Sequence, residues 1–409
     1  MVITGIGPVT PLGIGVDAFW ASLRGGVSGV RPITAFDPSR MKVRIAADVP
    51  DFEPEQFMGA KAARRMARFA QMAVAAAQLA RADAGLDLDA LDRSRLASVI
   101  NTGGGGVTTI AAETETLGRG GPGRVRALFV PMMAPNMASC QVSIELGLQG
   151  PAITGAAACA SSIYAFIEAK QIIEYGEADL AFVGGSESNI SELGIAGLAN
   201  MHALSRRNDD PPAASRPFDA ERDGFVFGEG GVVCVVESLE AARARGARIY
   251  AEILGGGRTA DAHHVTAPLP DGSGAAKAMQ RALDDAGLRA EDVDYICAHG
   301  TGTPLNDASE TRAIHAVFGE HAPRLLVSST KSMTGHLMGA AGALGVAATA
   351  LAIHHGEVPP TINLHTPDPD CDLDYVPNRS RVAPVRAALV NGFGFGGQNG
   401  VVALGRVAS

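Results

Sequence analysis

Short, uninterrupted apolar runs alternate with longer Ala-rich stretches along this chain. Continuous apolar runs are typical of strands that are buried on both faces of a sheet. They predict strands at Ser98–Ile100, Leu180–Val183, Gly231–Val236, Tyr295–Ala298, Leu325–Ser328 and Ala388–Val390. The Ala-rich stretches mostly end near a glycine, as helix C-caps do, and they predict helices at Ala63–Asp83, Ala160–Tyr175, Gly274–Asp285 and Leu337–His354. The alternation of strands and helices predicts a layered α/β fold.

The second half of the chain repeats the element order of the first half. A helix that ends in AGL precedes a strand and a glycine-rich turn twice, once as NTGGGG and once as AHGTGT. Further along each half, GAAACASS and KSMTGHLMGAAG both open an Ala-rich helix. The repeat predicts a duplicated domain with halves at residues 1–245 and 246–409. Because no linker composition marks the join, we expect the halves to pack as one body.

Composition excludes several classes of protein. The 409 residues are 46% hydrophobic and carry a net charge of −9, which argues against a nucleic-acid-binding protein. The most apolar tract, Leu337–Ile353, is interrupted by glycines and falls short of the roughly 18 residues of a membrane span, so no membrane association is expected. The start MVITGIG lacks the features of a secretion signal. Five cysteines without a CxxC pair indicate a reducing compartment without disulfides or structural zinc, and we expect a cytoplasmic protein.

Cys159 stands in GAAACASSIYAF, after an apolar run and at the start of a predicted helix. A strand-to-helix turn flanked by small residues holds a nucleophile in a strained, exposed position. The helix N-terminus lowers the pKa of a thiol and offers backbone N–H groups to an anion, so Cys159 is a candidate nucleophile. For a lone cysteine among alanines a buried structural role is the commoner case, and this alternative stays open. The other four cysteines are interpreted as structural.

Two histidines lie at glycine-rich junctions in the second half. His299 follows a predicted strand in CAHGTGTP, and His336 precedes a predicted helix in STKSMTGHLMGAAG, with Lys331 five residues upstream. Either histidine alone is explained as a polar residue at the end of an element. Together with Cys159 they lack the sequence spacing of metal ligands and fit a nucleophile with its bases, so no metal is expected.

Two glycine-rich segments could form functional loops. NGFGFGGQNG, at Asn391–Gly400, combines flexible backbone with bulky side chains and is a candidate gate or a donor of a backbone N–H to an oxyanion. It is not a dinucleotide fingerprint, because neither a helix nor an acidic residue follows it; a plain glycine hairpin is the alternative. NTGGGG, at Asn101–Gly106, lacks the GK[ST] of a phosphate-binding loop, so nucleotide binding is not expected.

Six ordered motifs make the chain similar to a known family. They are ACASS around Cys159, SRPFDAERDGFVFGEG at Ser215–Gly230, HGTGTPLND at His299–Asp307, SSTKSMTGH at Ser328–His336, PPTINL at Pro359–Leu364, and NGFGFGGQNG. Over essentially its whole length the chain resembles the elongating β-ketoacyl-[acyl-carrier-protein] synthases of type II fatty-acid synthesis. The resemblance implies the thiolase fold, a duplicated five-layer αβαβα architecture of two pseudo-symmetric halves, and a homodimer built across the first half.

The resemblance also implies a two-stage reaction without a cofactor. An acyl chain moves from acyl carrier protein to Cys159; malonyl-[acyl-carrier-protein] then loses CO₂, and its carbanion attacks the thioester to give 3-oxoacyl-[acyl-carrier-protein]. The backbone N–H groups of Cys159 and Phe395 would hold the oxyanion, each donor being worth about 3–4 kcal/mol. His299 and His336 would donate to the malonyl thioester carbonyl, and Lys331 would fix His336 electrostatically.

Further roles are carried over from the family in the same way. Thr301 and Thr303 would touch the pantetheine arm of the carrier, and Phe393 and Phe395 would gate the entry of the acyl chain. Gly104 takes the place of a bulky residue that lines the acyl pocket, which predicts a wider tunnel for long or unusual chains. The catalytic set Cys159, His299 and His336 is that of elongating enzymes; initiating enzymes carry Asn at the second histidine, and thiolases a second cysteine.

Three departures from the family pattern bear on its other features. Gly345 replaces a glutamate that supports a monovalent cation in related enzymes, which puts a cation site in doubt. Gly392 and Gln398 stand where Ser and Thr are usual. These departures leave open a ketosynthase of a type II polyketide or polyene pathway, which would work as a heterodimer with a chain-length factor.

Carrier proteins are acidic, so an acidic enzyme needs a local basic patch to bind them. Lys61, Arg64, Arg65 and Arg68 follow i, i+3, i+4, i+7 spacing at the start of a predicted helix and are expected to share one face. We predict that this face receives the carrier, with an ordinary solvated helix face as the alternative. A non-catalytic chain-length partner is disfavoured because Cys159 and both histidines are intact, and a thiolase-fold acyl hydrolase or binding protein is the remaining alternative.

Overall fold

The main sheet consists of two groups of five strands that have the same internal order. In the computed structural model, which describes residues 1–407, the order outward from the middle is β1, β8, β7, β5, β6 in one group and β9, β15, β14, β10, β11 in the other. If the strands of each group are numbered 1 to 5 along the chain, both groups have the spatial order 1-5-4-2-3. In both groups strand 2 runs parallel to strands 4 and 3, and the other neighbouring pairs are antiparallel. Pairing of Val2 with Glu252 and of Ile3 with Ala251 joins the groups. The predicted duplication is confirmed.

The strands of the first group are β1 (Val2–Thr10), β5 (Leu96–Asn101), β6 (Ala152–Ile153), β7 (Leu180–Glu187) and β8 (Gly230–Glu237). Those of the second group are β9 (Ala251–Ala260), β10 (Tyr295–Cys297), β11 (Leu326–Ser328), β14 (Ala387–Gly394) and β15 (Gln398–Gly405). Short strands complete the set: β2 (Gly13–Ile14) pairs with β1, β3 (Arg31–Pro32) with β4 (Ile45–Ala46), and β12 (Glu357–Val358) with β13 (Arg381–Val382).

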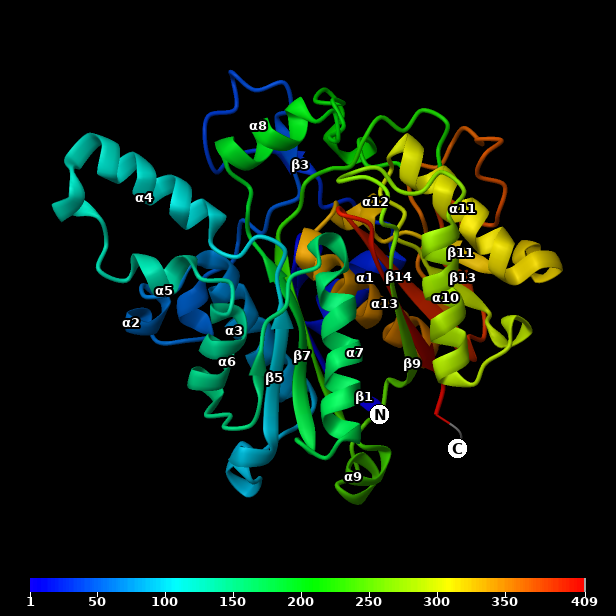
Figure 1. Ribbon diagram of the computed structural model, residues 1–409, viewed down its shortest axis with the longest axis horizontal. Coiled ribbons are helices and arrows are strands. Elements are labelled where there is room, and N and C mark those ends of the chain that lie inside the picture. The colour runs from blue at the N-terminus through cyan, green and yellow to red at the C-terminus, as the bar shows by residue number, and fades with distance from the viewer. Residues whose placement is uncertain (408–409) are drawn as a thin grey trace.

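Helices cover both groups of strands and separate them. The helices are α1 (Val16–Arg24), α2 (Ala60–Ala63), α3 (Arg68–Asp83), α4 (Val107–Gly120), α5 (Phe129–Met133), α6 (Met137–Leu146), α7 (Ser161–Glu174), α8 (Glu192–Asn200), α9 (Leu239–Ala244), α10 (Ser273–Ala286), α11 (Pro304–Phe318), α12 (Lys331–Thr334) and α13 (Ala341–His355). From left to right in Figure 1, α3 and α6 lie outside the first group, α7 and α13 lie between the groups, and α10 and α11 lie outside the second. This is the expected five-layer order.

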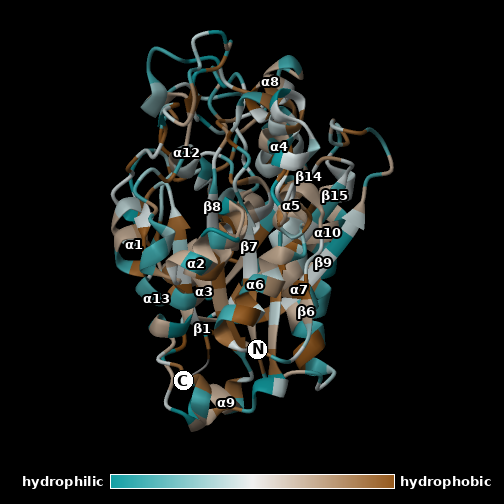
Figure 2. Cartoon of the chain, turned by 90° about the vertical axis from the view of Figure 1, so that its left-hand side faces the viewer, coloured by the Kyte–Doolittle hydropathy of each residue, from teal (hydrophilic) through white to brown (hydrophobic). Residues whose placement is uncertain are grey.

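The two central helices are close because small residues line their contact. At Gly342 of α13, a Cβ atom would lie 2.6 Å from Cγ1 of Ile163 on α7, so only glycine permits this approach. The segment Met338–His355 is apolar and long enough to cross a membrane, but 83% of it is buried in this structure, as expected for a core helix. Hydrophobic residues also dominate the strands and the inner helix faces in Figure 2.

Most predicted elements are present, and one helix starts later than predicted. The predicted helix Ala63–Asp83 is wrong at its N-terminus: α2 ends at Ala63, residues 64–67 form a turn, and α3 begins at Arg68. The predicted helix Leu337–His354 is split, because a single 3₁₀ turn at Met338–Ala340 precedes α13. All five cysteines are free thiols, which agrees with the absence of a disulfide framework.

Candidate active site

Cys159 lies in the sharp turn that opens α7. Ala158 adopts a left-handed backbone conformation with φ of 47°, which is strained for a residue with a side chain. Ser161 stabilises the turn, because its hydroxyl accepts the N–H of Ala157 at 2.8 Å and donates to the carbonyl of Ala158 at 2.7 Å. The predicted strain is present, but the predicted exposure is wrong: Cys159 is only 4% exposed and is reached through a pocket.

The thiol of Cys159 is protonated in the free protein. Burial raises its pKa to about 11, although the Lys331 charge and the backbone N–H groups of Phe395 and Cys159 act in the opposite direction. The lowered thiol pKa that the helix N-terminus predicts is therefore wrong for this state, because desolvation of the thiolate outweighs these favourable charges. The backbone N–H groups of Cys159 and Phe395 both lower the pKa of the thiol, so both groups lie beside the sulfur.

His299 and His336 meet Cys159 in the same pocket. The sulfur and one ring nitrogen of each histidine all lie within 4.8 Å of one another, and the two rings are perpendicular with centroids 5.4 Å apart. Burial, followed by the charge of Lys331, lowers the pKa of both imidazoles well below its usual value, so both rings are neutral at physiological pH. Each ring therefore has one N–H donor.

Backbone contacts determine which nitrogen of His336 carries the proton. The N–H of Met338 donates to Nδ1 of His336 at 3.1 Å, so this nitrogen is an acceptor and the proton resides on Nε2. Nε2 is buried and has no hydrogen-bond partner among residues 1–407. An unpaired buried donor beside the Cys159 sulfur is a group that awaits an oxygen acceptor.

A buried carboxylate that sequence reasoning missed holds His299. Oxygens of Glu310 accept the backbone N–H groups of His299 at 2.8 Å and of Gly300 at 2.7 Å, and also the amide of Asn391 at 3.0 Å. Lys331 donates to the backbone carbonyl of His299. Lys331 also acts on His336 through its charge, which is the kind of electrostatic influence that the resemblance implies, while its hydrogen bond is to His299. Glu310 lies eleven positions after His299 in α11, a helix that was not among the predicted elements.

The pocket that leads to the sulfur has a volume of about 290 Å³. Besides Cys159 and the two histidines, its wall includes Thr301, Thr303, Phe225, Phe393, Phe395 and Asn399. The ring of Phe393 lies 5.6 Å from that of His299. The structure thus brings together the residues that the sequence suggested for the nucleophile, the imidazoles, the gate and the pantetheine contacts.

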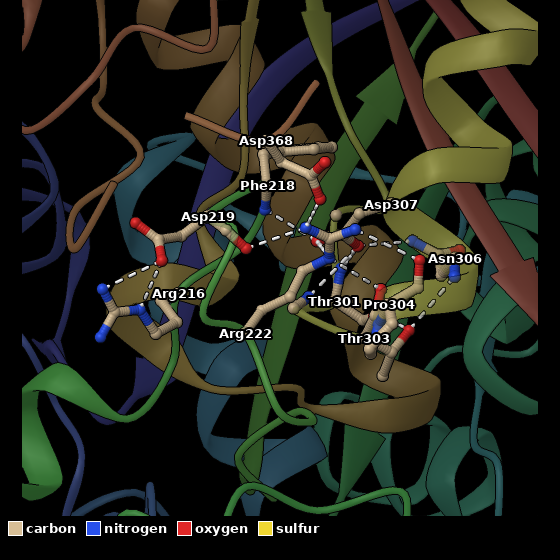
Figure 3. Close-up of polar contacts among 12 residues, drawn as sticks. Arg216, Phe218, Asp219, Arg222, Thr301, Thr303, Pro304, Asn306, Asp307 and Asp368 are labelled. Carbon is tan, nitrogen blue, oxygen red and sulfur yellow. Dashed lines mark hydrogen bonds and ion pairs between the residues drawn. The ribbon is translucent and has the colours of Figure 1, made fainter. Parts of the chain in front are cut away.

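A network of charges supports the loop that carries the two threonines (Figure 3). Asp307 is fully buried and accepts the backbone N–H groups of Thr301 at 3.1 Å and of Phe218 at 2.8 Å. Arg222 lies 3.6 Å from Asp307, donates to the carbonyl of Thr303 at 3.3 Å and also pairs with Asp368. As a result the two threonine hydroxyls are held 3.0 Å apart at the pocket wall.

Two predicted features are corrected by the structure. Gly104 is not in the pocket wall, and a Cβ there would lie 2.3 Å from the amide nitrogen of Asn189, so Asn189 fills the space that the missing side chain was expected to open. Arg68 does not share a helix face with Lys61, because α2 ends between them. Its guanidinium instead forms an ion pair with Glu229 at 2.7 Å. Lys61, Arg64 and Arg65 are exposed.

Two places in the described residues bear on metal binding. The thiol and imidazoles of Cys159, His299 and His336 are near enough to act as ligands of one soft ion, which their sequence spacing did not reveal. At Gly345, where the resemblance implies a glutamate near a monovalent cation, a Cβ would meet Cγ1 of Val390 at 2.9 Å and Sγ of Cys297 at 3.4 Å. These surroundings do not fit the family's cation site, because a hard cation requires oxygen ligands.

Comparison with known proteins places these observations in context. The family described as "Beta-ketoacyl synthase, N-terminal domain" matches residues 1–242, and "Beta-ketoacyl synthase, C-terminal domain" matches residues 250–365. The 3-oxoacyl-[acyl-carrier-protein] synthase 2 of Synechocystis sp. is 48% identical over 399 residues, which cover 98% of this chain and 96% of that protein.

Solved ketosynthases share the fold over the whole chain. The ishigamide ketosynthase/chain length factor is 41% identical with a TM-score of 0.94, and the match covers 100% of this chain and 99% of that one. A type II polyketide acyl-carrier protein in complex with its ketosynthase bound to the hexaketide gives a ketosynthase match with 35% identity, a TM-score of 0.91 and the same coverage. The expected duplicated thiolase-like fold is confirmed.

Proposed function

Because the chain belongs to the β-ketoacyl synthase family, we propose that it condenses an acyl chain on Cys159 with malonyl-[acyl-carrier-protein] in fatty-acid elongation. The products are 3-oxoacyl-[acyl-carrier-protein], CO₂ and free carrier protein. One observation carries the proposal: a thiol, two neutral imidazoles and two convergent backbone N–H groups meet in one pocket. The names of the relatives as 3-oxoacyl-[acyl-carrier-protein] synthase 2 support the same activity.

The first stage transfers the acyl group to Cys159. The sulfur attacks the thioester carbonyl of the acyl carrier, and the N–H groups of Cys159 and Phe395 hold the resulting oxyanion. The intermediate expels the pantetheine thiolate, which takes the proton that Cys159 has lost. The high pKa of the free thiol means that the proton leaves only when the substrate carbonyl is in place.

The second stage forms the carbon nucleophile. His299 and His336 donate to the thioester carbonyl of the malonyl group, where negative charge develops as CO₂ leaves. Because both rings are neutral, they stabilise the enolate without protonating its carbon first. The electron pair of the broken C–C bond supplies the nucleophile, so the reaction requires no cofactor. Attack of this carbon on the acyl-Cys159 carbonyl expels the Cys159 thiolate, which recovers a proton from solvent.

The pocket wall and the surface suggest how the carrier is bound. Thr301 and Thr303 offer paired hydroxyls to the pantetheine arm, and Phe393 and Phe395 stand as the gate. Lys61, Arg64 and Arg65 are exposed and form the basic surface that we assign to the acidic carrier, without Arg68. The polyketide ketosynthase in complex with its acyl-carrier protein supports this kind of partner.

The proposed assembly is a homodimer across the first half, at residues 1–245. Strand β6 is an edge of the main sheet and contacts α6, which in turn contacts α5, and α5 contacts α4. This part of the chain carries apolar side chains that are exposed in the single chain. These side chains are Ile110, Leu117, Leu128, Val130, Ile144 and Ile153. A second copy would cover them and continue the sheet. We also propose a cytoplasmic location, which the five free cysteines without a CxxC pair support.

A type II polyketide or polyene pathway is the second candidate. The match to the ishigamide ketosynthase/chain length factor favours it, and the same apolar surface would then bind a chain-length factor. Reconstitution with purified acyl- and malonyl-[acyl-carrier-protein] tests the choice. The fatty-acid proposal predicts 3-oxoacyl product from this chain alone, as a homodimer. Product only after addition of a partner subunit would support the second candidate, and no product with either would refute both.

A further inference from the structure

The turn that opens α13 has the same shape as the turn that carries Cys159. In the first half the 3₁₀ turn Ala158–Ala160 precedes α7, and in the second half Met338–Ala340 precedes α13. The first residue of each turn has a positive φ, 47° at Ala158 and 48° at Met338. Gly339 is therefore the counterpart of Cys159 in the duplicated fold. Its backbone N–H occupies the position that corresponds to the oxyanion-binding N–H of Cys159.

A buried carboxylate already occupies this second anion site. Glu187, the last residue of β7, is fully buried, and its Oε2 accepts the N–H groups of Gly339 at 3.0 Å and Gly103 at 2.8 Å. Its Oε1 accepts the N–H of Gly104 at 3.2 Å and the amide of Asn189 at 2.6 Å. The hydroxyl of Thr102 completes the set at 3.2 Å. Burial raises the pKa of Glu187, and the hydrogen bonds from these donors act in the opposite direction. Each oxygen accepts two N–H groups, which is the arrangement that suits a carboxylate acceptor.

The carboxylate also joins the two halves of the molecule behind the catalytic groups. A Cβ on Gly339 would lie 2.2 Å from the nitrogen of Gly103, so the two backbones touch here and only glycine fits. The neighbouring N–H, that of Met338, is the one that donates to Nδ1 of His336. Successive N–H groups of one strained turn thus contact Glu187 and His336.

We propose that Glu187 is a positioning residue: its carboxyl group occupies the second-half counterpart of the oxyanion hole and holds the Met338–Gly339 turn. It thereby keeps the His336 Nε2–H directed at the substrate carbonyl. The inference rests on the proposed function of His336. Removal of the carboxylate frees the turn, loosens the Met338 contact and lets the His336 ring change its tautomer. Decarboxylation depends on the Nε2–H donor of His336, whereas loading of Cys159 does not.

Replacement of Glu187 is expected to affect acyl loading of Cys159 in the opposite direction to decarboxylation. The negative charge of Glu187 raises the pKa of the Cys159 thiol. Replacement by a neutral residue should leave acyl loading unchanged or make it faster, while the decarboxylation becomes slower. A variant that merely disturbed the fold would slow both.

The test compares Glu187→Gln, which keeps the volume, with Glu187→Ala, which leaves a cavity lined by N–H groups. Glu237→Gln is the matched control, because Glu237 is a buried glutamate in the adjacent strand β8, where it pairs with Leu180 at the end of β7 away from Glu187. Initial rates of CO₂ release from malonyl-[acyl-carrier-protein] and of acyl loading are measured separately. We expect decarboxylation to fall about 10- to 100-fold in both Glu187 variants, because a small misplacement of a catalytic group costs up to about 100-fold in rate. Loading should be at least as fast as in the wild type.

Two further measurements separate positioning from a general structural effect. Formate added to Glu187→Ala should restore part of the decarboxylation rate, because it can occupy the vacated anion site, and it should not affect Glu237→Gln. In ¹⁵N-histidine NMR spectra, the wild type should show His336 protonated at Nε2 and Glu187→Gln a mixture of tautomers. Equal loss of both half-reactions without formate rescue, or an unchanged tautomer, would overturn the inference. If the wild type itself released no CO₂, the proposed function would be refuted. The NMR measurement would still test whether Glu187 determines the tautomer of His336.

Discussion

The backbone N–H of Met338 donates to Nδ1 of His336 at 3.1 Å. This contact turns a histidine that could act as a base into one that can only donate from Nε2, as long as the ring stays neutral. Burial and the Lys331 charge keep it neutral, since both lower its pKa. This geometry supports the proposed role of His336 as an oxyanion donor, because its Nδ1 is occupied and does not accept a proton from substrate.

The first prediction follows from this donor role. His336→Ala should decrease CO₂ release from malonyl-[acyl-carrier-protein] by about 10²- to 10³-fold, the usual effect of removing one oxyanion donor. Acyl loading of Cys159, measured by intact mass, should change by less than about threefold, because the N–H groups of Cys159 and Phe395 remain. Parallel loss of loading would contradict the separation of roles between the two stages.

The second prediction concerns the pH dependence of the thiol. With a pKa of about 11 the Cys159 thiol is the major form throughout the neutral range, and at pH 8 about one molecule in a thousand carries the thiolate. Since only the thiolate is alkylated, the rate of iodoacetamide modification should rise about tenfold per pH unit between pH 7 and 10. A plateau near pH 7 would show instead a thiol activated before substrate binds. Lys331→Met should slow the reaction further, because the Lys331 charge lowers the Cys159 pKa.

A third prediction concerns the charge network beneath Thr301 and Thr303. Arg222 is buried beside the fully buried Asp307, so Arg222→Met leaves Asp307 without its cationic partner. Loss of one partner of a buried pair costs about 3–5 kcal/mol of unfolding free energy. Urea denaturation should show that loss. The exposed pair of Arg95 with Asp179 provides the control, and Arg95→Met should lower the unfolding free energy far less than Arg222→Met. An Arg222 effect as small as the control would refute the supporting role of the network.

The fourth prediction tests the surface assigned to the carrier. The double charge reversal Arg64→Glu with Arg65→Glu should raise KM for acyl-[acyl-carrier-protein] and leave loading from small acyl thioesters unchanged, because only the carrier contacts this surface. The effect should diminish as salt increases. Lys277→Glu, an exposed reversal on α10, is the matched control. An unchanged KM in the double variant would remove the assignment.

Much of this fold follows from local patterns. Continuous apolar runs located β5, β7, β8, β10, β11 and β14 and missed β1, β6, β9 and β15 of the main sheet. The repeated motifs revealed the duplication, because they lie within a few consecutive residues. The late start of α3 could not be seen, because Lys61 to Arg68 have uniform helix propensity and the break depends on the contact of Arg68 with Glu229, a residue 161 positions away.

The sequence predicted which residues form the site, but it did not predict the pKa of the thiol. The sequence places Cys159 at the start of a helix but does not reveal how deeply its side chain is buried, and burial raises the pKa of the thiol. The buried carboxylates Glu187 and Glu310 were missed because they touch backbone N–H groups, which every residue type has, so no motif marks their partners. The space beside Gly104 was misjudged for a similar reason, since Asn189 fills it from another element.

The intact mass of the protein after exposure to acyl-[acyl-carrier-protein] tests the central claim most directly. The account predicts an increase equal to one acyl group, located on Cys159 by peptide mapping, absent in Cys159→Ala, and lost again when malonyl-[acyl-carrier-protein] is added and CO₂ appears. An acyl group carried on another residue, or one that malonyl-[acyl-carrier-protein] does not discharge, would contradict it.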